Sequence, residues 1–145
     1  MVVIEFLTQK KMTLKYFFLT IVPYLLFGCK EVSICKDFKV GRYKVVSETA
    51  LSDFEITRTL INQIERNEQG DVTYYTIEWI DECSFVSKFD KTKMTLNDDM
   101  KMINSDGGLV VELLEVLDND CISFQSYVKN FKDLSFSKGK FCRIK

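Results

Sequence analysis

The sequence predicts a single, mainly β domain: an antiparallel meander of strands that closes toward a small barrel, preceded by an N-terminal signal helix. Three observations support this prediction. Segments rich in β-branched and aromatic residues follow one another with short, turn-like links. The 145 residues, of which 46% are apolar, suit one domain with an ordinary core. The chain has no Pro/Gly-rich linker, internal repeat or low-complexity tract that would separate a second domain.

Charge and composition exclude several classes of function. With 20 basic and 21 acidic residues, the chain lacks the positive field of a nucleic-acid binder, so we expect no nucleic-acid partner. Histidine is absent, which removes the commonest general base and the commonest transition-metal ligand. A cysteine nucleophile would therefore lack its usual activating base. We expect no enzymatic activity, no metal site and no cofactor.

The first 28 residues are typical of a signal peptide. Lys10, Lys11 and Lys15 precede an apolar run over residues 16–27, which is shorter than the roughly 20 residues of a membrane-spanning helix. Met12 begins a conventional short signal of its own. Residues 1–11 would then be an upstream extension, and both starts remain open.

A short motif follows the apolar run. Leu26-Phe27-Gly28-Cys29 resembles the bacterial lipobox, in which the cysteine thiol is acylated and becomes the new N-terminus. The resemblance implies that Cys29 carries lipid, that residues 29–145 form the mature β domain and that residues 29–34 are its tether. It implies a lipid-anchored protein of the bacterial cell envelope, facing the periplasm or the cell surface. Ordinary secretion and a buried N-terminal helix are the alternatives.

The other four cysteines are expected to form disulfides, because thiols outside the cytoplasm tend to be oxidised. Residues 121–129 and 134–142 predict a hairpin around the turn at residues 130–133. Folding it symmetrically places Cys121 opposite Cys142, and directly opposed Cα atoms lie about 4.5–5.5 Å apart, within disulfide range. This pairing leaves Cys35 with Cys83. Four buried free thiols are the alternative.

The remaining strands follow from residue type. We expect strands over residues 39–47, 54–66, 72–79, 85–89 and 109–117, giving seven or eight in all, with residues 92–105 irregular or helical. The turn at residues 118–120 would join the last of these to the Cys121 strand. Its symmetric register opposes three apolar pairs on one face. The pairs are Val116 with Ile122, Leu114 with Phe124, and Val110 with Val128.

Two motifs suggest a family. They are Cys-x-x-Phe-x-x-Gly-x-Tyr, at Cys35, Phe38, Gly41 and Tyr43, and Trp-x-x-x-Cys-x-Phe, at Trp79, Cys83 and Phe85, with Ile56-Thr-Arg58 between them. Over about residues 35–89 the chain resembles short exported proteins of Bacteroidetes, which implies the pairing of Cys35 with Cys83. Some such proteins are labelled DNA topoisomerase IV, which an exported chain without a Gly-rich nucleotide loop or a catalytic-tyrosine context contradicts. The Gly-x-Tyr and Trp placement also resembles lipocalins and implies a lipocalin-like barrel without naming a ligand.

Candidate sites are weighed against plainer interpretations. Tyr43, Tyr75, Trp79 and Phe85 are candidates for lining a pocket for a small apolar ligand, although such residues are more often core. Two acidic clusters, at residues 97–99 and 118–120, lack the spacing of a calcium loop and are expected to be turns. The even spacing of arginines 58 and 66 on one long strand could favour an anion, but a solvated face is the simpler interpretation.

Two functions remain. The first is a lipid-anchored carrier or sensor with a small ligand inside the barrel, motivated by apolar residues on both faces of several strands. The alternative is an envelope interaction or structural module that meets a protein partner and holds no ligand. The identity of the ligand or partner and the oligomeric state do not follow from the sequence.

Overall fold

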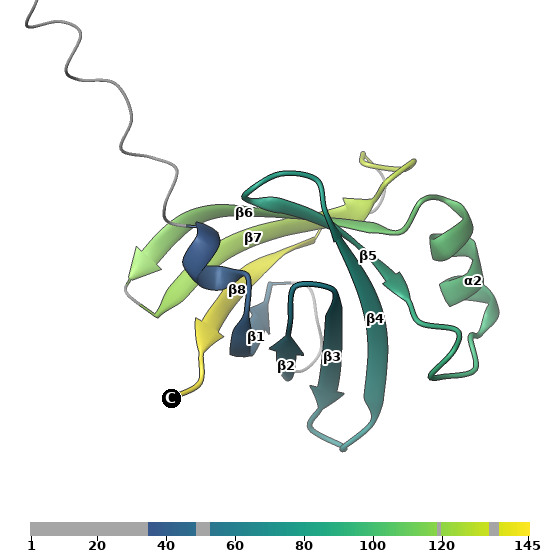
Figure 1. Cartoon of the computed structure of the whole chain (residues 1–145), viewed down its shortest axis with the longest axis horizontal. Coiled ribbons are helices and arrows are strands. Elements are labelled where there is room, and N and C mark those ends of the chain that lie inside the picture. Colours follow the sequence, from purple (N-terminus) through teal and green to yellow (C-terminus); the bar gives the residue numbers. More distant parts are fainter. Residues whose placement is uncertain (1–34, 49–52, 119, 134–136) are drawn as a thin grey trace, which may run out of the picture. The chain divides into compact units, whose positions relative to one another are not determined.

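The computed structural model describes residues 35–48, 53–118, 120–133 and 137–145 (Figure 1). The predicted signal segment, Cys29 and the tether lie outside these residues. The chain divides into two units, Met1–Glu31 and Val32–Lys145, and everything described below belongs to the second. Within the described residues, no helix is both long and apolar enough to span a membrane.

Eight antiparallel strands form a closed barrel in sequence order, which confirms the predicted mainly β meander and barrel. Strand β1 pairs with β2 on one side and with β8 on the other, so the sheet has no free edge. The strands are β1 (Gly41–Ser47), β2 (Phe54–Arg58), β3 (Asn62–Asn67), β4 (Val72–Trp79), β5 (Ser84–Phe89), β6 (Leu109–Asp118), β7 (Cys121–Val128) and β8 (Ser137–Arg143).

The two ends of the barrel differ in what covers them. At one end, the closed end, lie the 3-10 helix η2 (Cys35–Phe38), the β2–β3, β4–β5 and β6–β7 turns, and the C-terminal residues. The other four connections lie at the opposite, open end, including the helix α2 (Asp98–Ser105) between β5 and β6. Figure 1 shows η2 close to the β6–β7 turn and α2 on the far side of the barrel.

The predicted single strand over residues 54–66 is wrong. The chain turns back after Arg58, and β2 pairs with β3 in a hairpin that opposes Arg58 with Gln63. The Thr59 hydroxyl fixes this turn by accepting hydrogen bonds from the backbone N–H groups of Ile61 and Asn62. Nothing in the turn is a glycine or proline, so the usual sequence signal for a hairpin is missing.

The predicted β6–β7 register is correct at one end only. Val116 does lie opposite Ile122, but Phe124 faces Leu113 rather than Leu114. A register irregularity between Leu113 and Val116 inserts an extra residue into β6. From Leu113 toward the start of β6 the pairing is shifted by one residue, which places Tyr127, not Val128, opposite Val110. Leu114 therefore points outward and is exposed.

Both predicted disulfides are confirmed, and both lie at the closed end. Cys121 and Cys142 are directly opposed on β7 and β8, with Cα atoms 4.1 Å apart, as the hairpin register predicts. Cys35 in η2 bonds to Cys83 in the β4–β5 turn, with Cα atoms 5.2 Å apart. Two disulfides indicate that the domain resides in an oxidising, non-cytoplasmic compartment.

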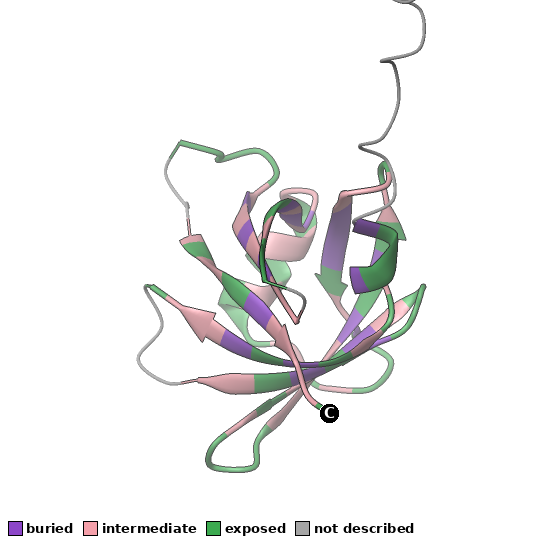
Figure 2. Ribbon diagram, turned by 90° about the vertical axis from the view of Figure 1, so that its left-hand side faces the viewer, coloured by how far each residue is buried: buried purple, intermediate pink, exposed green. Residues whose placement is uncertain are grey.

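The core occupies the closed half of the barrel, where inward-facing aromatic and branched residues pack. Buried and exposed residues alternate along the strands, as expected for a sheet with one face inside (Figure 2). Gly41 has φ +152°, and a Cβ there would meet the Tyr43 Oη at 2.9 Å. Only glycine lets the Tyr43 ring fold back over β1, where its hydroxyl donates to the Val40 carbonyl.

The predicted irregular or helical stretch contains α2, which packs against β5. Asn97 caps its N-terminus by accepting from the Met100 N–H at 2.8 Å. At its C-terminal end, the Asn104 side chain exchanges two hydrogen bonds with the backbone of Phe89. These bonds fix α2 beside the open end of the barrel.

Candidate ligand-binding cavity

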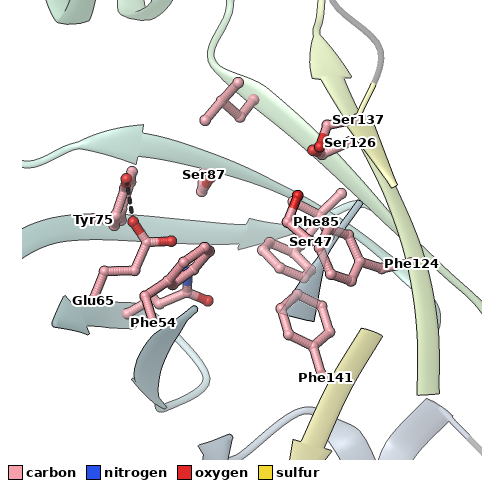
Figure 3. Close-up of a pocket in the computed structure, with 13 residues that line it drawn as sticks. Ser47, Phe54, Glu65, Tyr75, Phe85, Ser87, Phe124, Ser126, Ser137 and Phe141 are labelled. Atoms are coloured by element: carbon pink, nitrogen blue, oxygen red, sulfur yellow. Dashed lines mark hydrogen bonds between the residues drawn. The ribbon is translucent and has the colours of Figure 1, made fainter. Parts of the chain in front are cut away.

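A cavity of about 260 Å³ occupies the open half of the barrel. Its lining residues come from all eight strands of the ring, so it lies inside the barrel and not on its outer surface. Figure 3 shows the side chains converging on it. The lining residues are Ser47, Phe54, Gln63, Glu65, Tyr75, Phe85, Ser87, Leu109, Val111, Phe124, Ser126, Ser137 and Phe141.

Aromatic rings form the floor of the cavity. Phe124 and Phe141, on neighbouring strands, stack with their centroids 4.1 Å apart. Phe85 is completely buried beside them, and Phe54 closes one side nearer the mouth. These rings offer an apolar surface of the kind that small-molecule sites use.

A buried arginine lies directly beneath this floor. Arg58, 1% exposed, holds its guanidinium carbon 4.6 Å from the Phe85 ring centre and 4.5 Å from that of Phe141. Its Nε donates to the Gln63 Oε1 at 2.7 Å, and its Nη1 donates to the Phe38 carbonyl at 3.4 Å. Burial lowers the pKa of Arg58 to about 10, so the group remains charged at neutral pH.

A carboxylate projects into the cavity from β3. Glu65 Oε2 accepts a 2.6 Å hydrogen bond from the Tyr75 hydroxyl, drawn as the dashed line in Figure 3. Burial raises the pKa of Glu65, although the hydrogen bonds from Tyr75 and Gln63 and the charge of Arg58 oppose the shift. Burial and the same carboxylate raise the pKa of Tyr75, which stays a neutral donor.

Hydroxyl groups lie across the cavity from this carboxylate. Ser126 on β7 is directly opposed to Ser137 on β8, and Ser47 lies on the adjoining strand β1. Strands β7 and β8 are four positions away from β3 and β4 in the ring of eight, so these serines face Glu65 across the interior (Figure 3). The mouth is therefore polar while the floor is apolar.

Of the four predicted pocket residues, the structure brings two to the cavity. Tyr75 and Phe85 line it. Tyr43 lies beneath the floor, fully buried against Arg58. Trp79 points toward the closed end, where its Nε1 donates to the Leu60 carbonyl at 3.1 Å.

The sequence reasoning missed the polar residues of the site. Arg58 is an interior side chain and not part of a solvated face, whereas Arg66 is exposed, so the two do not share a surface. Phe54, Ile56 and Arg58 alternate along β2 on the inward side. An arginine in step with two apolar residues is the signal that would have placed it inside.

The two acidic clusters stabilise a turn and a helix N-terminus. One Asp118 carboxylate oxygen accepts from the backbone N–H groups of Asp120 and Cys121, which closes the β6–β7 turn. Asn97 is the cap of α2 described above. Among the described residues, no group of three or more acidic or cysteine side chains is arranged to hold a metal ion.

No protein-family model matches the chain, and neither a curated protein nor a solved structure matches it. The function is therefore argued from the barrel and its cavity alone.

Proposed function

We propose that this chain is a lipid-anchored protein of the bacterial cell envelope whose barrel binds a small, largely apolar ligand, as a carrier or a sensor. The observation that carries the proposal is the cavity in the open half of the barrel, with its aromatic floor. Barrels of eight strands have an interior wide enough for one small ligand when side chains do not fill it. Here side chains fill the closed half only.

Binding in the cavity is tested by filling it. Ser126→Trp introduces a ring from the cavity wall, and Lys140→Trp, on the outer face of β8, is its matched control. Protein extracted from membranes is examined by native mass spectrometry, and an apolar fluorescent dye reports on the interior. We expect a bound small molecule or a dye signal that Ser126→Trp abolishes and the control keeps. Wild-type protein with neither would contradict the proposal.

The lipobox resemblance at Cys29 supports the anchor, and the disulfides support export, because disulfides persist in oxidising compartments outside the cytoplasm. Intact mass of the membrane-extracted protein tests it. We expect a diacyl or triacyl increment that disappears in Cys29→Ser, and a gain of about 4 Da on reduction of two disulfides. An unprocessed, fully reduced chain would contradict export altogether.

The anchor would orient the barrel. Cys35 follows Cys29 by six residues, and an extended chain spans at most about 3.3–3.6 Å per residue, so the tether reaches roughly 20 Å. Cys35 is bonded to the closed end through Cys83. The closed end therefore faces the bilayer in this proposal, and the mouth of the cavity faces away from it.

An exposed apolar cluster at the closed end fits this orientation. Leu60, Ile61 and Ile80, which we call the apolar tip, are 57%, 67% and 57% exposed. The half-buried Trp79 precedes Ile80 in the chain, and its indole N–H donates to the Leu60 carbonyl. Apolar and tryptophan side chains favour the bilayer interface. A lipid surface within reach of the tether would cover them.

The alternative is an interaction module without a ligand, and a different surface favours it. Leu114 and Leu117, on the outer face of β6, are 52% and 51% exposed. A protein partner could bury them. Crosslinking in membranes followed by affinity capture tests this alternative: wild type should capture a partner that Leu114→Ser with Leu117→Ser loses, and an empty capture would rule the module out.

A further inference from the structure

Among the described residues, the cavity lining contains an acidic side chain but no lysine or arginine. Glu65 is the one aspartate, glutamate, lysine or arginine of the lining, as the structure describes it. One of its oxygens is held by the Tyr75 hydroxyl at 2.6 Å. Figure 3 shows the other oxygen directed away from Tyr75, toward the space among the rings. A ligand that enters the cavity thus meets a carboxyl group that accepts hydrogen bonds and, when ionised, carries a negative charge.

The positive charge of the barrel interior is kept out of the ligand's reach. Arg58 is 1% exposed and does not line the cavity, because Phe85 and Phe141 cover its guanidinium. Gln63 connects it to the cavity by accepting from Arg58 Nε at 2.7 Å and bonding with its side chain to Glu65. Arg58 is therefore a positioning residue: its charge favours the ionised carboxylate from beneath the floor of the cavity.

The rings around the carboxylate suit a cation as well as an apolar body. The Phe54 ring lies next to Glu65 in the cavity, and the Phe85 ring lies farther along the same lining (Figure 3). Ring faces attract ammonium groups within about 6 Å of the centroid, and more strongly when water is excluded. An anionic ligand would instead bring a second negative charge next to a partly desolvated carboxylate, which is unfavourable.

We propose that the cavity selects a small ligand with a protonated amine, whose ammonium group binds Glu65 and whose apolar body lies on the rings of Phe85, Phe124 and Phe141. The proposal rests on ligand binding in the barrel, as proposed above, and adds the chemical class. The cavity volume of about 260 Å³ is below the range of drug-sized sites, so the body is a single ring or a short chain. The serines at the mouth accommodate a polar substituent at the other end.

Three probes of matched shape test the class: 2-phenylethylamine, 2-phenylethanol and phenylacetate. Their affinities for the purified, disulfide-bonded full chain are measured by calorimetry at pH 7. We expect the amine to bind at least tenfold more tightly than the alcohol, and phenylacetate to bind least. Amine binding should also strengthen as the pH rises through the pKa of Glu65, because the carboxylate ionises.

Variants assign the preference to Glu65. Glu65→Gln keeps the size and the hydrogen bond from Tyr75 but removes the charge, so we expect it to bind amine and alcohol equally and without pH dependence. Glu55→Gln removes an exposed carboxylate from the neighbouring strand and should change nothing. Tyr75→Phe keeps the carboxylate and loses one bond to it, so the pH midpoint of amine binding should move upward.

The results distinguish a failure of the amine class from a failure of ligand binding itself. Equal binding of amine and alcohol by the wild type, tighter binding of phenylacetate, or an amine preference that survives in Glu65→Gln would overturn the amine class and leave a ligand-binding barrel. If none of the probes binds and the dye finds no interior site, the ligand-binding function fails as well. Thermal unfolding of each variant verifies that it is folded.

Discussion

The two halves of the barrel are built from the same eight strands but differ in how their interior is packed. In the closed half, Tyr43, Ile56 and Ile122 are buried almost completely, and two disulfides fasten the connections. In the open half, the same inward positions carry Glu65 and serines, and a cavity remains. The inward-facing side chains thus fill the interior in the closed half and leave it partly empty in the open half.

This division would separate the residues that stabilise the fold from those of the proposed binding site. Close packing in the closed half provides the hydrophobic stabilisation, because stabilisation follows the apolar area removed from water. The open half can then carry polar groups that contribute little to folding. Substitutions in the two halves should therefore differ in what they change, and four experiments test this expectation.

The largest effect is expected at the boundary between the halves. Phe141→Ala removes a ring that stacks on Phe124 at 4.1 Å and covers Arg58 at 4.5 Å. Buried Phe→Ala substitutions typically cost about 3–5 kcal/mol. Ser126→Ala, on the cavity wall, should change stability by less than about 0.5 kcal/mol. Urea unfolding measures both, and equal losses would show that the open half is as tightly packed as the closed half.

The disulfides should rank next, and in a fixed order. Loop-closure entropy predicts about 4 kcal/mol for Cys35–Cys83, which closes 48 residues, and about 3 kcal/mol for Cys121–Cys142, which closes 21. Denaturation of Cys→Ser variants measures each loss. The double variant of one pair should lose no more than either single variant, whereas additive losses would indicate that the two cysteines are not partners.

The accuracy of the predictions from sequence differs between parts of the barrel. The hairpin that opposes Cys121 and Cys142 followed from strand propensity and symmetry, because both strands pair without interruption. The predicted β6–β7 register is wrong from Leu113 back to Leu109, because the pattern of apolar residues does not reveal a bulge. Local patterns were therefore sufficient where pairing is regular and insufficient where one residue is inserted.

The site was harder to predict than the fold. Tyr75 and Phe85 were found because aromatic residues are common in pockets, but Glu65 and Arg58 were missed. Their positions depend on the turn at Thr59–Ile61, which reverses a segment that appeared to be one strand. Once that turn is assigned, Arg58 and Gln63 become opposed residues on neighbouring strands, and their contact follows.

The carboxylate in the cavity should give the stability a pH dependence of intermediate size. Because burial raises the folded-state pKa of Glu65 above its usual 4.5, the folded state binds the proton more tightly than the unfolded chain. The resulting stability is full below pH 4.5 and is lost as the pH rises through the folded-state pKa. Arg58 stays charged in both states over this range and adds no slope.

Urea unfolding between pH 4 and pH 8 measures this effect as the difference between wild type and Glu65→Gln. The difference cancels the opposite contributions of Asp90 and Glu112, whose pKa values are lowered by hydrogen bonds. We expect the wild type to lose stability relative to the variant as the pH rises. A difference that is flat with pH would contradict the raised pKa of Glu65, because it would mean that folding does not change the affinity of this carboxylate for a proton.

The smallest effect on stability is expected at the apolar tip, where the effect on orientation should be large. Leu60→Asp with Ile61→Asp alters two exposed side chains and should shift the unfolding free energy by no more than about 0.5 kcal/mol each. Trp79, the one tryptophan of the chain, reports on their position relative to the bilayer. In vesicles with brominated acyl chains, the anchored wild type should show quenched tryptophan fluorescence, and the variant much less.

Met102→Asp is the matched control, because Met102 is equally apolar and 57% exposed but lies on α2 at the open end. It should leave the quenching unchanged. Co-flotation with vesicles, which the proposed lipid at Cys29 would provide, should persist in all three proteins. Anchored wild-type protein without quenching would mean that the closed end does not touch the bilayer. The tip would then be free for a partner, and the two ends of the barrel would no longer divide between membrane and ligand.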